Sequence, residues 1–97
     1  MNYIKKSNLK SFVFILINDF SLIAFSNALE PLRLANRLAQ KQLYSWKITS
    51  ETGEKVKCSS GFYLDVESSI HKIQNDDYLI ICSGENIKKN ITKTTLN

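Results

Sequence analysis

Few residues of this sequence are of types that catalyse reactions or bind metal ions. The 97 residues contain two cysteines, Cys58 and Cys82, in separate strand-like segments without Cys-x-x-Cys spacing, and one histidine, His71. A zinc site needs three or four such ligands, and a thiol nucleophile needs a base within hydrogen-bond reach. The sequence therefore predicts two reduced thiols, no metal site, no cofactor and no enzymatic activity.

A second set of candidate residues follows two wholly apolar segments, residues 12–17 and 78–82. In an open parallel sheet, ligands bind outside the carboxyl ends of the strands. Carboxylates and aromatic faces in that position suit a small cationic metabolite. Simpler roles stay open, because Asp19 or Ser21 can cap a helix and Phe20 can be a core residue. The candidate ligand-binding residues are Asn18, Asp19, Phe20, Ser83, Gly84 and Glu85.

The elements that must position these residues follow from hydrophobic periodicity. The two apolar segments are typical of strands covered on both faces of a parallel sheet, whereas residues 44–50 alternate and indicate a strand nearer the sheet edge. Residues 55–67 predict two short extended pieces around a turn at 59–61, and Ser68 or Ser69 begins a short helix that reaches Gln74. Ile87 and Ile91 begin a last helix. This order predicts an α/β fold, the incomplete N-terminal half of a flavodoxin-like parallel sheet.

Residues 22–39 have the period of an amphipathic helix whose apolar stripe, with alanines beside it, faces the sheet. Ile23 and Leu34 lie instead in the polar sector near Glu30, so these three residues are the predicted dimer contact. Pro31 interrupts the helical ladder by removing the hydrogen bond to the Asn27 carbonyl. The stripe comprises Leu22, Phe25, Leu29 and Leu32, beside Ala24, Ala28, Ala35 and Ala39.

The net charge of +4 is concentrated at the two ends of the chain. Residues 1–18 and 88–97 each contain three lysines and no acid, whereas residues 19–87 contain seven basic and nine acidic residues. A DNA-binding domain usually gathers its basic residues on one face, so direct DNA binding by this chain is not expected.

The first apolar run stops at Asn18 and is too short for a membrane span, which favours a cytoplasmic protein.

Three stretches carry a resemblance to a known family: "ALEPLRLANRL", "YSWKITSETGEKVKCSSG" and "DYLIICSG". They resemble the N-terminal domain of GlxA-type regulators of the AraC family of bacterial transcription activators. In that family, a PfpI/ThiJ-like domain related to class I glutamine amidotransferases precedes two helix-turn-helix motifs. The resemblance implies a basic tail at residues 1–11 and a partial PfpI-like domain at 12–97, without the rest of that domain or the DNA-binding domain. Pro31 matches a proline of the family's first helix.

The resemblance also implies a function. The chain would be the ligand-sensing and dimerisation part of a regulator, a homodimer through its first helix, responding to a small choline-derived or arginine-like metabolite. DNA contact would need the absent C-terminal domain. Relatives usually have Gly-Gly where this chain has Ser83-Gly84, and their nucleophile segment lies on the next strand, so Cys82 is not that nucleophile. The alternatives are a PfpI-like hydrolase or amidase fragment and a small stand-alone dimerisation module.

Overall fold

The first apolar segment forms a central strand in the computed structural model, which describes residues 9–84. Strand β1 (Lys10–Leu16) lies between β2 (Tyr44–Ser50) and β6 (Tyr78–Cys82), and the two-residue strand β5 (Ser68–Ser69) follows β2 at the outside. All neighbouring pairs in this sheet, ordered β5-β2-β1-β6, are parallel. The predicted adjacency and direction of the two apolar strands are therefore confirmed, and with them an α/β fold. The flavodoxin-like assignment stays a prediction.

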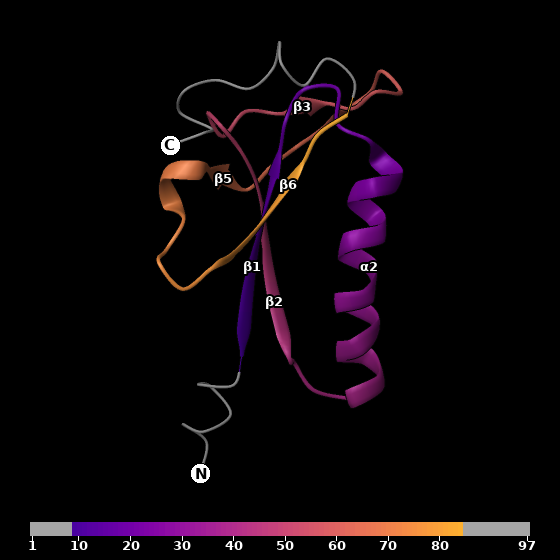
Figure 1. Cartoon of the computed structure of the whole chain (residues 1–97), viewed down its shortest axis with the longest axis vertical. Coiled ribbons are helices and arrows are strands. Elements are labelled where there is room, and N and C mark those ends of the chain that lie inside the picture. Colours follow the sequence, from indigo (N-terminus) through magenta and orange to yellow (C-terminus); the bar gives the residue numbers. More distant parts are fainter. Residues whose placement is uncertain (1–8, 85–97) are drawn as a thin grey trace.

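Helix α2 (Leu22–Ala39) packs on one face of the sheet (Figure 1). The Ser21 hydroxyl accepts a hydrogen bond from the Ala24 amide and caps the N-terminus. At the other end, Gln40 adopts the left-handed conformation with φ 55°. The bounds agree with the periodicity, because the stripe that begins at Leu22 is long enough to cover the sheet.

The hydrophobic core lies between α2 and the sheet. Phe14 of β1 is fully buried, and its ring meets the Phe25 ring edge-on at 5.4 Å between centroids. Phe25 also meets the buried Phe20 at 6.1 Å, so three phenylalanines join strand, loop and helix. The apolar stripe of the helix therefore faces the sheet as predicted. Residues packed around this centre include Leu22, Ala28, Leu29, Leu32, Ile48 and Ile80.

The connection from β2 to β6 packs in two places: its first part joins the core beside α2 through Val56 and Cys58, and its later part lies on the other side of the sheet. It contains an antiparallel pair, β3 (Val56–Lys57) with β4 (Tyr63–Leu64), and after β5 a 3-10 turn η1 (Ile70–Lys72). Figure 1 shows α2 on one side of the sheet and η1 on the other. The predicted extended pieces around residues 59–61 are thus confirmed as β3 and β4.

Three predictions differ from the structure. Strand β6 is an edge strand within residues 9–84, so Leu79 and Ile81 are half-exposed rather than covered on both faces. The segment expected as a helix up to Gln74 forms β5 and η1, and the Ser69 side chain makes no capping hydrogen bond. Strand β1 begins at Lys10, so the last two residues of the predicted tail belong to the sheet. The predicted helix at Ile87 and Ile91 lies outside the described residues.

Pro31 is accommodated inside an uninterrupted α2. Its missing N–H leaves the Asn27 carbonyl without its helical partner. Both residues are exposed, so water can hydrogen-bond to that carbonyl and the helix continues through the proline.

Candidate functional site

The candidate site is a loop, residues 18–20, held between two other segments at the carboxyl ends of the strands. On one side the Asp19 amide donates to the Lys57 carbonyl at 2.7 Å, and the Ser59 amide donates to the Phe20 carbonyl at 2.8 Å. On the other side the Ser21 amide donates to the Ser83 carbonyl at 3.2 Å. Main-chain bonds thus fix the loop between β3 and the end of β6.

Gly84 allows this close approach. A Cβ at position 84 would lie 3.2 Å from the Ser21 amide nitrogen and closer still to the Asp19 carbonyl oxygen. Both are main-chain atoms and cannot turn aside as a flexible side chain would. Gly84 also forms an isolated antiparallel bridge with Phe20. Position 84 therefore requires a residue without a side chain for a packing reason.

The charged groups at this site are of opposite sign. Asp19 Oδ1 lies 3.5 Å from Lys57 Nζ, with the two side chains 25% and 42% exposed. Asn18 Oδ1 accepts the Lys57 amide at 3.2 Å, and Asp19 adopts the left-handed conformation with φ 68°. Lys57 was not among the predicted residues, because no local pattern reveals that β3 returns to this loop.

The structure brings most of the predicted ligand-binding residues together. Asn18 and Asp19 face the β3 side of the loop, and Ser83 and Gly84 lie on the β6 side. Phe20 is fully buried in the core, so its ring exposes no face to a ligand and acts in packing instead. Glu85 lies outside the described residues. Between the two possible helix caps, the structure selects Ser21.

The thiols of this chain are held in an apolar environment. Cys58 and Cys82 are free and buried, and both belong to the core cluster around Phe20. Burial raises the pKa of Cys82 to about 11, so this thiol is protonated at neutral pH and is a poor nucleophile. Within residues 9–84, no group of three or more His, Cys, Asp or Glu side chains is arranged to hold a metal ion.

The outer face of α2 carries an exposed apolar stripe. Ile23 is 71% exposed and Leu34 is 44% exposed, and the dimer contact that they were predicted to form stays a prediction. Leu38, 84% exposed, extends this exposed stripe four residues beyond Leu34. Residues four apart lie on the same face of a helix, so helical spacing continued from Leu34 would have found Leu38 in the sequence. Glu30 pairs with Arg33 at 2.7 Å on this helix, and the hydrogen bond from Arg33 lowers the pKa of the Glu30 carboxyl.

Comparison with curated proteins finds three bacterial regulators. The chain is 34% identical over 86 residues to the HTH-type transcriptional regulator GbdR of Pseudomonas aeruginosa (strain UCBPP-PA14), covering 89% of this chain and 23% of that protein. It is 33% identical to CdhR of P. aeruginosa PAO1 (77% and 22% covered) and 30% identical to GlxA of Rhizobium meliloti (79% and 24%). No family model matches the chain.

A solved structure agrees with these relatives. The crystal structure of an AraC family transcriptional regulator from Pseudomonas putida matches with a TM-score of 0.69 and 26% identity, over 79% of this chain and 42% of that one. The chain is a homologue of AraC-family transcriptional regulators. It spans about a quarter of the length of these curated regulators and corresponds to their N-terminal part.

This homology agrees with the sequence resemblance. Since the match covers only part of each relative, the regulators' activities and partners belong to the whole proteins. No helix among residues 9–84 is long and apolar enough to cross a membrane.

Proposed function

We propose that this chain is the effector-sensing and dimerisation part of a cytoplasmic AraC-family regulator. Its effector is a small nitrogenous metabolite, choline-derived or arginine-like, and DNA is contacted by a separate C-terminal domain. The observation that carries the proposal is the loop at residues 18–20, where a partly exposed carboxylate stands at the carboxyl end of the central strand in a homologue of regulators.

The charges of the loop support a cationic effector. Asp19 is paired with Lys57 at 3.5 Å, and both side chains are in contact with solvent. A partly exposed ion pair contributes little stability, so a metabolite cation can replace Lys57 Nζ beside Asp19 at small cost. The Lys57 ammonium released in this way is available to a carboxylate on the same metabolite.

The outer face of α2 supports self-association. Ile23, Leu34 and Leu38 form a row along one side of the helix, and the Glu30–Arg33 pair lies within it. A two-fold axis would bring the same row from two copies together, which buries Ile23 and the two leucines beside the Glu30–Arg33 pair.

Two observations disfavour the hydrolase or amidase alternative. The Cys82 thiol is buried and its pKa is raised to about 11, opposite to the lowered pKa of a cysteine nucleophile. The solvent-exposed His71 lies in η1, on the other side of the sheet from the α2 core that holds Cys82. The stand-alone dimerisation module remains as the second candidate, because the exposed row of Ile23, Leu34 and Leu38 is present whether or not residues 18–20 bind an effector.

Calorimetric titration tests the sensing proposal. Choline, betaine, carnitine and arginine are titrated into the chain, its Asp19→Asn variant and a Glu67→Gln control, which neutralises an exposed acid elsewhere. We expect saturable binding of one compound, weakened about tenfold or more in Asp19→Asn and unchanged in the control. Absence of binding by all four at millimolar concentration contradicts the effector class.

Light scattering tests the dimer. We expect a dimer mass for the wild type and a monomer mass for Ile23→Lys and Leu34→Lys. The control is Leu79→Lys, which places the same charge on a half-exposed leucine of β6, away from α2. A wild-type monomer, or dissociation by Leu79→Lys as well, contradicts an α2 interface.

A further inference from the structure

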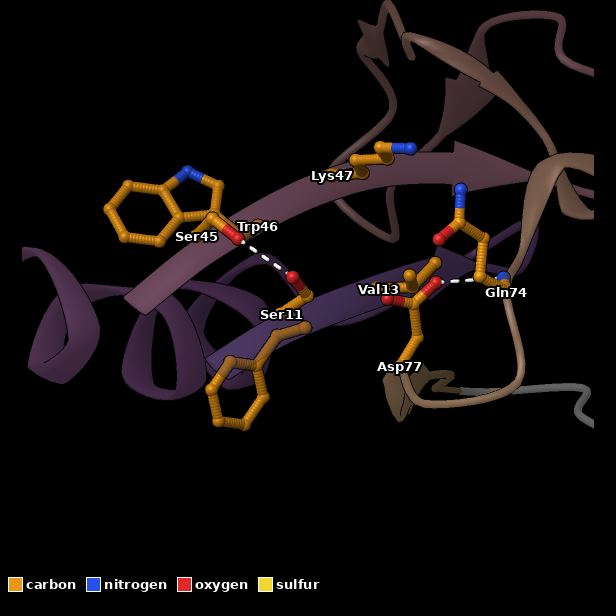
Figure 2. A pocket seen from close by; sticks show the side chains of 8 residues that line it. Ser11, Val13, Ser45, Trp46, Lys47, Gln74 and Asp77 are labelled. Carbon is orange, nitrogen blue, oxygen red and sulfur yellow. Dashed lines mark hydrogen bonds between the residues drawn. The ribbon is translucent and has the colours of Figure 1, made fainter. Parts of the chain in front are cut away.

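A small polar pocket lies near the amino ends of β1 and β2, at the end of the sheet opposite to residues 18–20. Its volume is about 140 Å³ (Figure 2). At ~30 Å³ per water molecule this is room for about four or five waters, well below the ~300 Å³ of a site for a drug-sized ligand. The lining residues are Ser11, Phe12, Val13, Ser45, Trp46, Lys47, Gln74 and Asp77.

The pocket has an apolar floor and a polar wall. Val13 of β1, 1% exposed, forms the floor and pairs with Lys47 of β2 in the sheet register. Gln74 and Asp77 come from the connection before β6 and face Lys47 across the pocket (Figure 2). Three separate segments of the chain therefore contribute polar side chains to one small space.

Several polar groups of the wall have hydrogen-bonding capacity to spare. The Ser11 and Ser45 hydroxyls share a single 3.0 Å hydrogen bond, which uses one hydroxyl proton and leaves the other. Asp77 Oδ2 accepts the Gln74 amide at 2.8 Å, whereas Oδ1 has no hydrogen-bond partner within residues 9–84. Lys47 likewise forms no ion pair in that part of the chain, so its ammonium group is not paired with the Asp77 carboxylate.

We infer that this pocket binds a small zwitterion of the α-amino-acid class. The Lys47 ammonium and the spare serine proton hold the carboxylate of the ligand, and Asp77 Oδ1 accepts from its ammonium group. A simple anion would place its negative charge near the Asp77 carboxylate, and a simple cation would place its positive charge near the Lys47 ammonium. Opposite charges on the wall and a volume of about 140 Å³ together select a short molecule with both charges. This site is independent of the effector proposed for residues 18–20.

The binding test follows backbone amide signals of the ¹⁵N-labelled chain by NMR. The probes are glycine, and acetate and methylammonium as its two halves, at constant ionic strength. We expect glycine to shift the amides of Ser11, Ser45, Lys47 and Asp77 saturably and at lower concentration than either half. Equal binding of acetate and glycine contradicts a zwitterion site, and no saturable shift at millimolar concentration contradicts the site altogether.

Charge-removing variants test the two assigned partners. Lys47→Met and Asp77→Asn keep the side-chain shapes, and Asp77→Asn keeps an oxygen acceptor for the Gln74 amide. Each is expected to weaken glycine binding about tenfold or more, whereas Lys41→Met, an exposed lysine outside the pocket, leaves it unchanged. Unchanged affinity in both variants overturns the assignment. Shifts confined to Asp19 and Ser83 also overturn it, yet leave the proposed effector site standing.

Discussion

Replacing Gly84 by alanine directly tests how the candidate site is built. The added methyl would lie 3.2 Å from the Ser21 amide nitrogen and nearer still to the Asp19 carbonyl oxygen. No positive φ contributes to this cost, because such a φ is found at Gly53 and Gly61 among the described glycines and not at Gly84. The penalty is therefore steric, and it is felt by the main chain of residues 19–21.

The expected magnitude follows from two opposing effects. Inserting a methyl group into a well-packed place costs about 1–3 kcal/mol, and alanine restricts the unfolded chain by about 0.4–1 kcal/mol relative to glycine. The net loss in the free energy of unfolding is about 1–2 kcal/mol. At 4–8 °C per kcal/mol for a domain of this size, Tm falls by roughly 5–15 °C.

Urea unfolding and NMR of the same variant provide the assay. The urea midpoint should fall with an unchanged m-value, and the amide signals of Asp19 and Ser21 should shift. Gly61→Ala is the control, since φ at Gly61 is +99° and no atom lies within 4 Å of an added Cβ. It should lose stability through backbone strain while the signals of Asp19 and Ser21 stay in place. A Gly84→Ala protein as stable as wild type, with unshifted signals, would refute the packing described for this loop.

Three further predictions concern single side chains. Ser21→Ala should lower the free energy of unfolding by about 1 kcal/mol by removing the cap of α2. The control Ser26→Ala changes a partly exposed serine within the helix that caps nothing, and it should change that free energy by less than about 0.5 kcal/mol in urea titrations. The pKa of Cys82 is raised from 9.0 to about 11, so between those pH values this thiol ionises in the unfolded chain and stays protonated in the folded one. Its contribution to the free energy of unfolding is therefore fully present below pH 9 and should be lost, by about 2–3 kcal/mol, as the pH rises towards 11. Cys82→Val should flatten that part of the pH profile of Tm. Ser68 Oγ is buried without a hydrogen-bond partner in the described chain, so Ser68→Ala should leave Tm equal or slightly higher.

Periodicity predicted the helix and the central pair of strands because both depend on local patterns. The apolar stripe beginning at Leu22 sets the start of α2, and the polar residues after Ala39 set its end. The unbroken apolar character of β1 correctly indicated a strand covered on both faces, since its residues from Val13 onward are buried. These features require no knowledge of distant parts of the chain.

The same pattern misled the prediction for β6. The residues of β6 are as apolar as those of β1, yet β6 lies at the edge of the described sheet with Leu79 and Ile81 half-exposed. An apolar run indicates that a strand can be buried on both faces, but it does not indicate which other element buries each face. Lys57 and Asp77 were missed for a related reason, because each reaches its partners through a connection whose path is set by tertiary packing.

Ser21 joins the candidate site to the helix that is proposed to form the dimer. Its amide donates to the Ser83 carbonyl at the end of β6, and its hydroxyl caps α2 two residues before Ile23. Its carbonyl accepts the Phe25 amide, and the Phe25 ring is locked against Phe14 and Phe20. A ligand that moves Asp19 or Ser83 must therefore either break the cap or carry the first turn of α2 with it. The exposed row of Ile23, Leu34 and Leu38 begins in that turn. We therefore expect effector binding to change the affinity of self-association, and thermodynamic linkage requires self-association to change the effector affinity by the same factor.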